Sequence, residues 1–190
     1  TERLYLNAYR PRMITFHHIH NYKDPYWAAI MNIYKRSFPI EEQRPTESME
    51  RLLAEENRYR ISALLNEESE PIGLLTSWNL GIFTYIEHFA IAPAFRSQGY
   101  GTWALKAFMH SLSSPMVLEV EPPIDDTTQQ RIQFYQRNGL ILYEYNYFQP
   151  PYTAEQEGVV LRLMGSIPEN KDFVTNVSYL LHKEVYGVKF

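Results

Sequence analysis

The stretch from residue 85 to residue 102, Tyr85-Ile-Glu-His-Phe-Ala-Ile-Ala-Pro-Ala-Phe-Arg-Ser-Gln-Gly-Tyr-Gly-Thr102, decides the fold. Its first half is rich in β-branched and aromatic residues, which predicts a strand that ends near Pro93. Its second half carries two glycines ahead of an apolar pattern with helical spacing, formed by Trp103, Leu105, Ala107, Phe108 and Leu112. The stretch therefore predicts a strand, a glycine-containing turn and the start of a helix.

This turn is suited to bind an anion. A helix start exposes backbone N–H groups without intrahelical partners, together with the positive end of the helix dipole. Gly99 and Gly101 allow the backbone to approach a ligand closely, and Arg96 adds a guanidinium group. The sequence therefore predicts a ligand that carries a pyrophosphate.

Hydrophobic periodicity places the other elements on both sides of this stretch. Strands are expected over residues 13–20, 58–66, 72–80, 84–92, 116–120, 140–148 and 159–164, and helices over 26–38, 46–57, 128–138 and 171–186. Short polar turns join the strands between residues 58 and 92, so these strands should be antiparallel neighbours. The pattern predicts one α+β domain with a helix attached at its C-terminus.

Composition excludes several classes of protein. The chain has 190 residues, 45% of them hydrophobic and 21% charged, which is enough apolar material for a packed core. Without cysteine there is no disulfide, no thiolate metal site and no cysteine nucleophile. A net charge of -4 argues against a nucleic-acid partner, and no apolar run reaches the length of a membrane helix. With no signal-peptide pattern at the start, we expect a cytoplasmic protein, with residues 1–12 as an extension and Met13 as a candidate natural start.

The motif Arg96-x-x-Gly99-x-Gly101, after an apolar strand, resembles the acyl-CoA-binding signature of the GCN5-related N-acetyltransferase (GNAT) superfamily. The order of elements agrees with that family, and so does a tyrosine shortly before a glycine, in Phe134-Tyr135-Gln136-Arg137-Asn138-Gly139. The resemblance implies a mixed, mostly antiparallel central sheet flanked by helices. It also implies an acyl-CoA-binding domain over residues 13–165, with a helical appendage over residues 166–190.

The resemblance further implies a site and a cosubstrate, acetyl-CoA. Backbone N–H groups from Gln98 to Thr102 would hold the pyrophosphate, the strand edge would pair with pantetheine, and Tyr135 would face the thioester sulfur. The expected cofactor-binding residues are Phe89, Ala90, Ile91, Arg96, Ser97, Gln98, Gly99, Tyr100, Gly101, Thr102 and Tyr135. The expected reaction is direct attack by a primary amine in a ternary complex, because no cysteine is available for an acyl-enzyme.

Two residues are the candidate catalytic groups. The phenol of Tyr135, with an ordinary pKa near 10, can protonate a departing thiolate. Strict alternation along the strand places Tyr85, Glu87, Phe89 and Ile91 on one face and Ile86, His88 and Ala90 on the other. Apolar surroundings would raise the pKa of the Glu87 carboxyl and make it a general base. If the faces are inverted, His88 becomes the base instead.

The sequence is also compatible with two other interpretations. A GNAT-fold protein that binds CoA without turnover is one alternative. A Rossmann-type NAD(P)-binding protein is another, because Gly99-x-Gly101-x-x-Ala104 fits a dinucleotide fingerprint with Glu119 or Glu121 as the ribose-binding acid. The residues between Pro93 and Gln98 disfavour it, since that loop should follow its strand directly.

The partners are less well defined by sequence. The acceptor is expected to be a small-molecule or peptide amine, and the protein is a candidate homodimer. Alternating Tyr143, Tyr145 and Tyr147, with Tyr152, either line the acceptor pocket or lie beneath the C-terminal helix. No metal site is expected, because only His18 and His20 of the three nearby histidines share a strand face.

Overall fold

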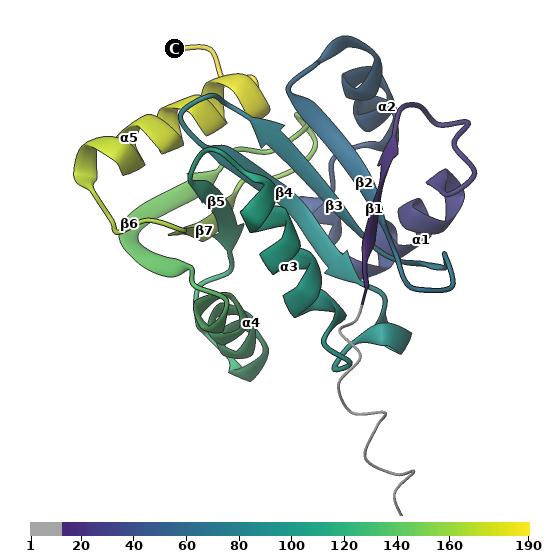
Figure 1. The fold of residues 1–190 in the computed structure, drawn as a ribbon. Coiled ribbons are helices and arrows are strands. Elements are labelled where there is room, and N and C mark those ends of the chain that lie inside the picture. The colour runs from purple at the N-terminus through teal and green to yellow at the C-terminus, as the bar shows by residue number, and fades with distance from the viewer. Residues whose placement is uncertain (1–12) are drawn as a thin grey trace, which may run out of the picture.

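The computed structural model describes residues 13–190, which form a seven-stranded sheet in the order β1-β2-β3-β4-β5-β7-β6 (Figure 1). The strands are β1 (Thr15–Ile19), β2 (Tyr59–Leu65), β3 (Pro71–Asn79), β4 (Thr84–Ile91), β5 (Met116–Val120), β6 (Ile141–Gln149) and β7 (Val159–Gly165). Every neighbouring pair is antiparallel except β4 and β5. The predicted mixed, mostly antiparallel sheet is confirmed, and the Rossmann alternative is wrong because it needs a doubly wound parallel sheet.

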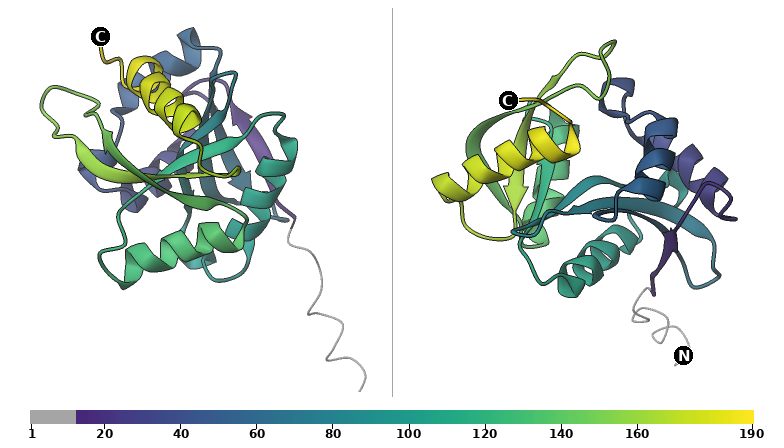
Figure 2. Two further views of the ribbon diagram at one scale, coloured as in Figure 1. Left: turned by 90° about the vertical axis from the view of Figure 1, so that its left-hand side faces the viewer. Right: turned by 90° about the horizontal axis from the view of Figure 1, so that it is seen from above.

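Helices cover both faces of the sheet (Figure 2). The helices are α1 (Trp27–Ser37), α2 (Thr46–Glu55), α3 (Tyr100–Ser111), α4 (Asp126–Arg137) and α5 (Lys171–Leu180). Short 3₁₀ turns lie at Ile40–Glu42 and Pro93–Phe95. Helices α1, α2 and α5 share one buried cluster of side chains, while α3 and α4 share a second cluster on the opposite face.

Alternation along the central strands builds these two clusters. On β3, Leu74 packs into the α1 cluster and the next residue, Leu75, packs into the α3 cluster. Both side chains are almost completely buried, as expected for a strand covered on both faces. The sheet therefore separates two apolar layers, one on each of its faces.

Most helix ends lie within two residues of the sequence prediction, and the ends of two helices bear on the site. Helix α3 begins at Tyr100, directly after Gly99, which is its N-cap in the left-handed conformation (φ 88°). The predicted C-terminal helix over residues 171–186 ends as an α-helix at Leu180 and continues as a π-helical turn, η3 (Leu181–Val185). Periodicity detects an apolar face but does not distinguish a regular α-helix from a single wider turn. The predicted extension over residues 1–12 lies outside the described residues.

Candidate active site

The parallel strands β4 and β5 separate along their length, which opens a cavity in the sheet. Their pairing covers three positions and ends at Ile86 opposite Leu118. A cavity of about 630 Å³ lies beyond that point, a size typical of small-molecule sites. Phe38 and Tyr152 line it from the α1 side of the sheet, and Phe134 and Tyr135 line it from the α4 side. The cavity therefore reaches both faces of the sheet.

The predicted anion-binding turn lies at one end of this cavity. Ser97 (φ 59°) and Gly99 (φ 88°) are both left-handed, so the chain reverses sharply ahead of α3. Within residues 13–190, the backbone N–H groups of Ser97, Gln98, Gly101 and Thr102 make no hydrogen bond. They lie at the positive end of a helix of 12 residues, where an anion would find both donors and a favourable dipole.

The side chains of this turn differ in whether they face the cavity. The Nε of Arg96 donates to the Ile91 carbonyl at 2.8 Å, and its guanidinium lines the cavity without an ion pair among the described residues. Gln98 donates to the carbonyl of Ala94 instead. The Tyr100 ring is buried, and its hydroxyl donates to Glu67. The side chains of Gln98 and Tyr100 therefore point away from the cavity that the turn borders.

Strand β4 supplies the wall next to the turn. Phe89, Ala90 and Ile91 all line the cavity, where the sequence predicts the pantetheine arm. The parallel partner β5 no longer pairs with this part of β4, so that edge of the backbone faces the opening. An extended chain could add to it as a strand would.

Tyr135 lies on the α4 side of the opening. Its ring is buried beside Phe134, with a centroid distance of 5.2 Å, and burial raises the pKa of its phenol to about 12. The hydroxyl makes no hydrogen bond to residues 13–190, and the residue lines the cavity. A neutral phenol is therefore available to a ligand in this cavity.

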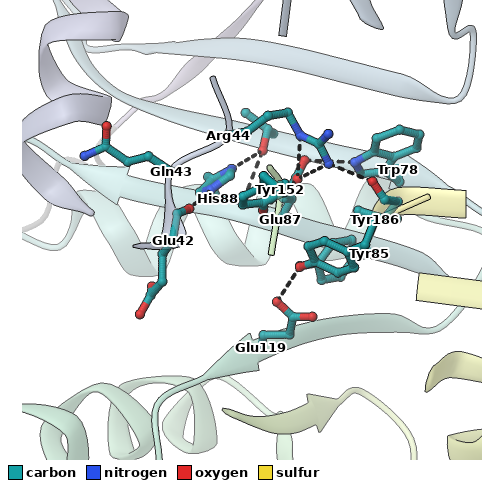
Figure 3. Close-up of polar contacts among 12 residues, drawn as sticks. Glu42, Gln43, Arg44, Trp78, Tyr85, Glu87, His88, Glu119, Tyr152 and Tyr186 are labelled. Carbon is teal, nitrogen blue, oxygen red and sulfur yellow. Dashed lines mark hydrogen bonds and ion pairs between the residues drawn. The ribbon is translucent and has the colours of Figure 1, made fainter. Parts of the chain in front are cut away.

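Glu87 has a different environment from the one predicted (Figure 3). Its Oε1 accepts from Nε and Nη2 of Arg44, at 2.9 and 2.7 Å, and from the Tyr152 hydroxyl at 2.9 Å. Its Oε2 accepts from the indole of Trp78 at 2.9 Å. Burial opposes ionisation, but the Arg44 guanidinium and these hydrogen bonds hold the pKa of Glu87 below its ordinary value. The expected rise in its pKa is therefore wrong.

A β-bulge explains why strict alternation also fails here. On β3, Thr76 pairs with His88 and the next residue, Ser77, pairs with Ile86, so Glu87 is an extra residue in β4. Glu87 and His88 consequently both face the α1 side, where His88 contacts Tyr34. The predicted division of β4 into two faces is correct only up to the bulge.

His88 is fixed by its neighbours. Because the Glu42 carbonyl can only accept, Nε2 of His88 carries the proton and donates to it at 2.9 Å. Nδ1 then accepts from the hydroxyl of Thr76 at 3.2 Å. Burial lowers the pKa of the imidazole, so the ring is neutral and both nitrogens are in use. This arrangement disfavours His88 as the base.

Glu119 on β5 is the buried carboxyl that faces the opening. Its Oε2 accepts from the hydroxyls of Tyr85 and Tyr186, each at 2.8 Å, while its Oε1 has no partner among the described residues (Figure 3). Burial raises the pKa of Glu119 to about 7, although the surrounding phenols oppose that rise. The residue lines the cavity from the α1 side, opposite Tyr135. One sequence signal pointed to it, a lone charge within the apolar strand Met116-Val-Leu-Glu-Val120.

Further carboxylates stand where the cavity opens. Glu42 and Glu121 both line it, and Glu121 forms an ion pair with Arg131. Burial, followed by the nearby charge of Glu121, raises the pKa of Glu42 to about 7. Glu42 makes no ion pair within residues 13–190. On this wall, Glu42 is thus an acidic group without a charge partner among the described residues, whereas Glu121 is paired with Arg131.

The predicted tyrosine series divides between two roles. Tyr143 and Tyr147 are buried in the core that α5 covers, whereas Tyr152 lines the cavity and contacts the Tyr186 ring at 5.2 Å. The histidines near the N-terminus are hydrogen-bonded, His17 to Asp24 and His18 to Ser62. The residue pattern did not select Arg44, and it gave Glu119 only as a ribose-binding acid of the dinucleotide alternative.

The sequence matches the family model for the acetyltransferase (GNAT) family over residues 27–140. A solved structure from Bacteroides thetaiotaomicron assigned to the GNAT family is 34% identical, with a TM-score of 0.85. That similarity covers 92% of this chain and 99% of the other. This chain belongs to the GNAT family.

More distant GNAT-fold structures show the same architecture. A chimera of the spermidine N-acetyltransferase SpeG from Vibrio cholerae and hSSAT is 15% identical, with a TM-score of 0.60 over 86% of this chain and 98% of that one. An acetyltransferase from Thermus thermophilus is 16% identical, with a TM-score of 0.59 over 80% of this chain and 96% of that one. No curated protein matches the sequence. The family assignment gives this GNAT protein acetyltransferase activity in general, and the cavity is where that activity would reside.

Within residues 13–190, no helix is both long and apolar enough to cross a membrane.

Proposed function

We propose that this protein is an acetyl-CoA-dependent N-acetyltransferase that acetylates a primary amine by direct transfer in a ternary complex. One observation carries the proposal. A single cavity reaches both faces of the sheet and combines the amide-lined turn, the Tyr135 phenol on one side and the Glu119 carboxyl on the other. Acetyl-CoA, when bound, supplies the acetyl group as a thioester.

Residues of the turn and of β4 fit the donor. The N–H groups of residues 97–102 would hold the pyrophosphate, and Arg96 would add a charged contact. The unpaired edge of β4 at Phe89, Ala90 and Ile91 would hold the pantetheine arm. A backbone N–H of β4 would stabilise the oxyanion.

Tyr135 and Glu119 supply the proton transfers. Glu119 accepts a proton from the attacking amine, because a carboxyl with a pKa near 7 exchanges protons readily at neutral pH. Tyr135 donates its phenolic proton to the sulfur as the carbon–sulfur bond breaks. The amine nitrogen thereby forms the amide, and the thiol leaves neutral.

Glu87 takes a supporting role in this proposal rather than that of the base. Its two oxygens accept four hydrogen bonds and it is paired with Arg44, so no lone pair is directed at a substrate amine. Through Tyr152 it fixes one wall of the cavity. Glu42, which lines the cavity without an ion pair within residues 13–190, would attract a cationic amine, either of a small molecule or of a peptide.

Thiol release from acetyl-CoA with a panel of amines tests the activity, and thermal shifts with CoA, acetyl-CoA and NAD test the ligand class. We expect stabilisation by CoA and acetyl-CoA, and thiol release that depends on an amine. Binding of CoA without release for any amine would favour the alternative of a CoA-binding protein. No stabilisation by CoA at all would reject both.

The variant Tyr135→Phe separates catalysis from binding. We expect turnover to fall by about 10²-fold, the lower end of the usual contribution of a general acid, with CoA affinity nearly unchanged. The matched control is Tyr143→Phe, whose hydroxyl instead donates to the Ile167 carbonyl in the core. Equal losses of CoA affinity and turnover in Tyr135→Phe would mean that the phenol is only a binding contact.

A homodimer remains part of the proposal. Phe148 and Val160, paired across β6 and β7 at the sheet edge, are 49% and 66% exposed and form an apolar surface suited to a second copy. Light scattering on Phe148→Ser and on the unmodified protein tests this, since only a dimer through that edge would dissociate in the variant.

A further inference from the structure

The C-terminal segment packs into the core behind the cavity, although it lies outside the region that matches the family. Val174 and Val177 of α5 and Leu181 and Val185 of η3 are buried with β4 and β6 side chains. In the π-helical turn, the N–H of Tyr186 donates to the carbonyl of Leu181 at 3.1 Å. This wider turn fixes where Tyr186 leaves the helix.

Residues 185 and 186 are linked to both buried carboxylates, to Glu87 through Arg44 and to Glu119 directly. The carbonyl of Val185 accepts from Nη2 of Arg44 at 2.9 Å, and Arg44 is the partner of Glu87. The hydroxyl of Tyr186 donates to Oε2 of Glu119 at 2.8 Å (Figure 3). Two consecutive residues therefore connect Glu87, through Arg44, with Glu119.

The hydrogen bonds around Glu119 are asymmetric. The hydroxyls of Tyr85 and Tyr186 both lie 2.8 Å from the same oxygen, Oε2, and 3.0 Å from each other. This triangle of two hydroxyls and one carboxylate oxygen fixes the carboxyl through Oε2. Oε1 is buried and has no partner within residues 13–190.

We propose that Tyr186 is a positioning residue of the acetyltransferase: together with Tyr85 it holds Oε2 of Glu119 and so fixes this carboxyl at the cavity, where it receives the proton of the acceptor amine. This inference rests on the proposed function, since it concerns how the proposed base is aimed. It also gives the C-terminal segment a role in the reaction, because no other described residue donates a hydrogen bond to Oε2.

Other charged and titratable groups also act on Glu119. The hydroxyl of Tyr147 on β6 faces this carboxyl but makes no hydrogen bond of normal geometry. The negative charge of Glu87 on β4 disfavours ionisation of Glu119. The hydroxyls of Tyr147, Tyr85 and Tyr186 oppose that effect, because they stabilise the ionised form. Loss of the Tyr85 or the Tyr186 hydroxyl should therefore raise the pKa of Glu119.

The kinetic test compares Tyr186→Phe with Tyr179→Phe. Tyr179 lies on α5, is 45% exposed and contacts the Phe190 ring, so its variant is a matched control outside the site. In Tyr186→Phe, the acidic limb of the kcat/KM profile should move upward by about one pH unit, with the high-pH plateau within a few-fold of the unmodified protein. Tyr85→Phe should produce the same shift from another element, and Tyr179→Phe should produce none.

A second readout does not depend on activity. The ¹³C chemical shift of labelled glutamate carboxyls, assigned to Glu119 by comparison with Glu119→Gln, reports its pKa directly. We expect that pKa to rise by about one unit in Tyr186→Phe and in Tyr85→Phe. If Tyr186→Phe does not fold, Tyr85→Phe tests the same pair of hydrogen bonds.

The outcomes distinguish the two proposals. If the unmodified protein releases no thiol from acetyl-CoA with any of the amines tested, the proposed function is rejected. The titration of Glu119 would then still decide whether Tyr186 holds this carboxyl. An active protein whose pH profile is the same in Tyr186→Phe and Tyr85→Phe as in the unmodified protein would overturn the inference. So would a profile that moves equally in Tyr179→Phe.

Discussion

Replacement of Arg44 by methionine should destabilise the protein strongly, and the loss of stability should increase as the pH rises. The Arg44 and Glu87 side chains are 8% and 0% exposed, and two of the four hydrogen bonds of the carboxylate come from the guanidinium. Without Arg44, Glu87 would be a buried charge with no counter-charge, left with the hydrogen bonds from Trp78 and Tyr152. Breaking such a pair costs about 3–5 kcal/mol, a large fraction of the usual stability of a domain.

The sign of the pH effect follows from the pKa of Glu87. In the unmodified protein this pKa is lowered by folding, so the pair stabilises at a pH above the unfolded pKa and that stability is lost in acid. In Arg44→Met, burial without a counter-charge should raise the pKa of Glu87. The difference in stability between variant and unmodified protein should therefore grow from pH 4.5 to pH 8.

Urea unfolding at several pH values measures this difference. The double variant Arg44→Met with Glu87→Gln removes the orphaned charge and should recover more than half of the loss at pH 8. A loss below about 1 kcal/mol for Arg44→Met, or an equal loss at every pH, would refute the assignment of a buried pair, because only solvated pairs are that weak.

Two further variants test the turn and the second carboxyl. Gly99→Ala and Gly81→Ala place a side chain at φ 88° and 81°, so each should lose about 1–2 kcal/mol of stability, but calorimetry should show weaker CoA binding only for Gly99→Ala. Weaker binding in both would point to general destabilisation. Folding raises the pKa of Glu119 from 4.5 to about 7, so this carboxyl destabilises the native state progressively between those pH values, by on the order of 3 kcal/mol in full. Glu119→Gln should therefore gain stability relative to the unmodified protein as pH rises from 5 to 8, while losing transfer activity; a constant difference across that range would mean that the pKa of Glu119 is ordinary.

Much of the fold could be predicted from local patterns. Alternating apolar residues identified all seven strands of the sheet, and the glycine-containing turn before α3 was visible because Gly99 permits a left-handed N-cap. Spacing within a single segment was sufficient for these elements. The turn lies at the cavity because it follows β4 directly in the chain, and β4 lines the cavity.

The environment of the carboxylates could not be predicted in this way. The charge partner of Glu87, Arg44, is 43 positions earlier in the chain, and the bulge at Glu87 depends on the register of two strands rather than on one sequence. Glu119 draws its hydrogen bonds from Tyr85 and from Tyr186, which is 67 positions later. Polar contacts of this range arise only when the sheet and the C-terminal segment come together.

The early end of the β4–β5 ladder has a mechanical consequence for the sheet. Backbone pairing between β4 and β5 ends at Ile86, and side-chain hydrogen bonds link the two parts of the sheet there. Tyr85 of β4 donates to Glu119 of β5, and Tyr152, which follows β6, donates to Glu87 of β4. Beyond the three paired positions, partly buried side-chain hydrogen bonds rather than main-chain hydrogen bonds connect the two halves of the sheet. A long, thin ligand can enter the gap without breaking any rung of the ladder.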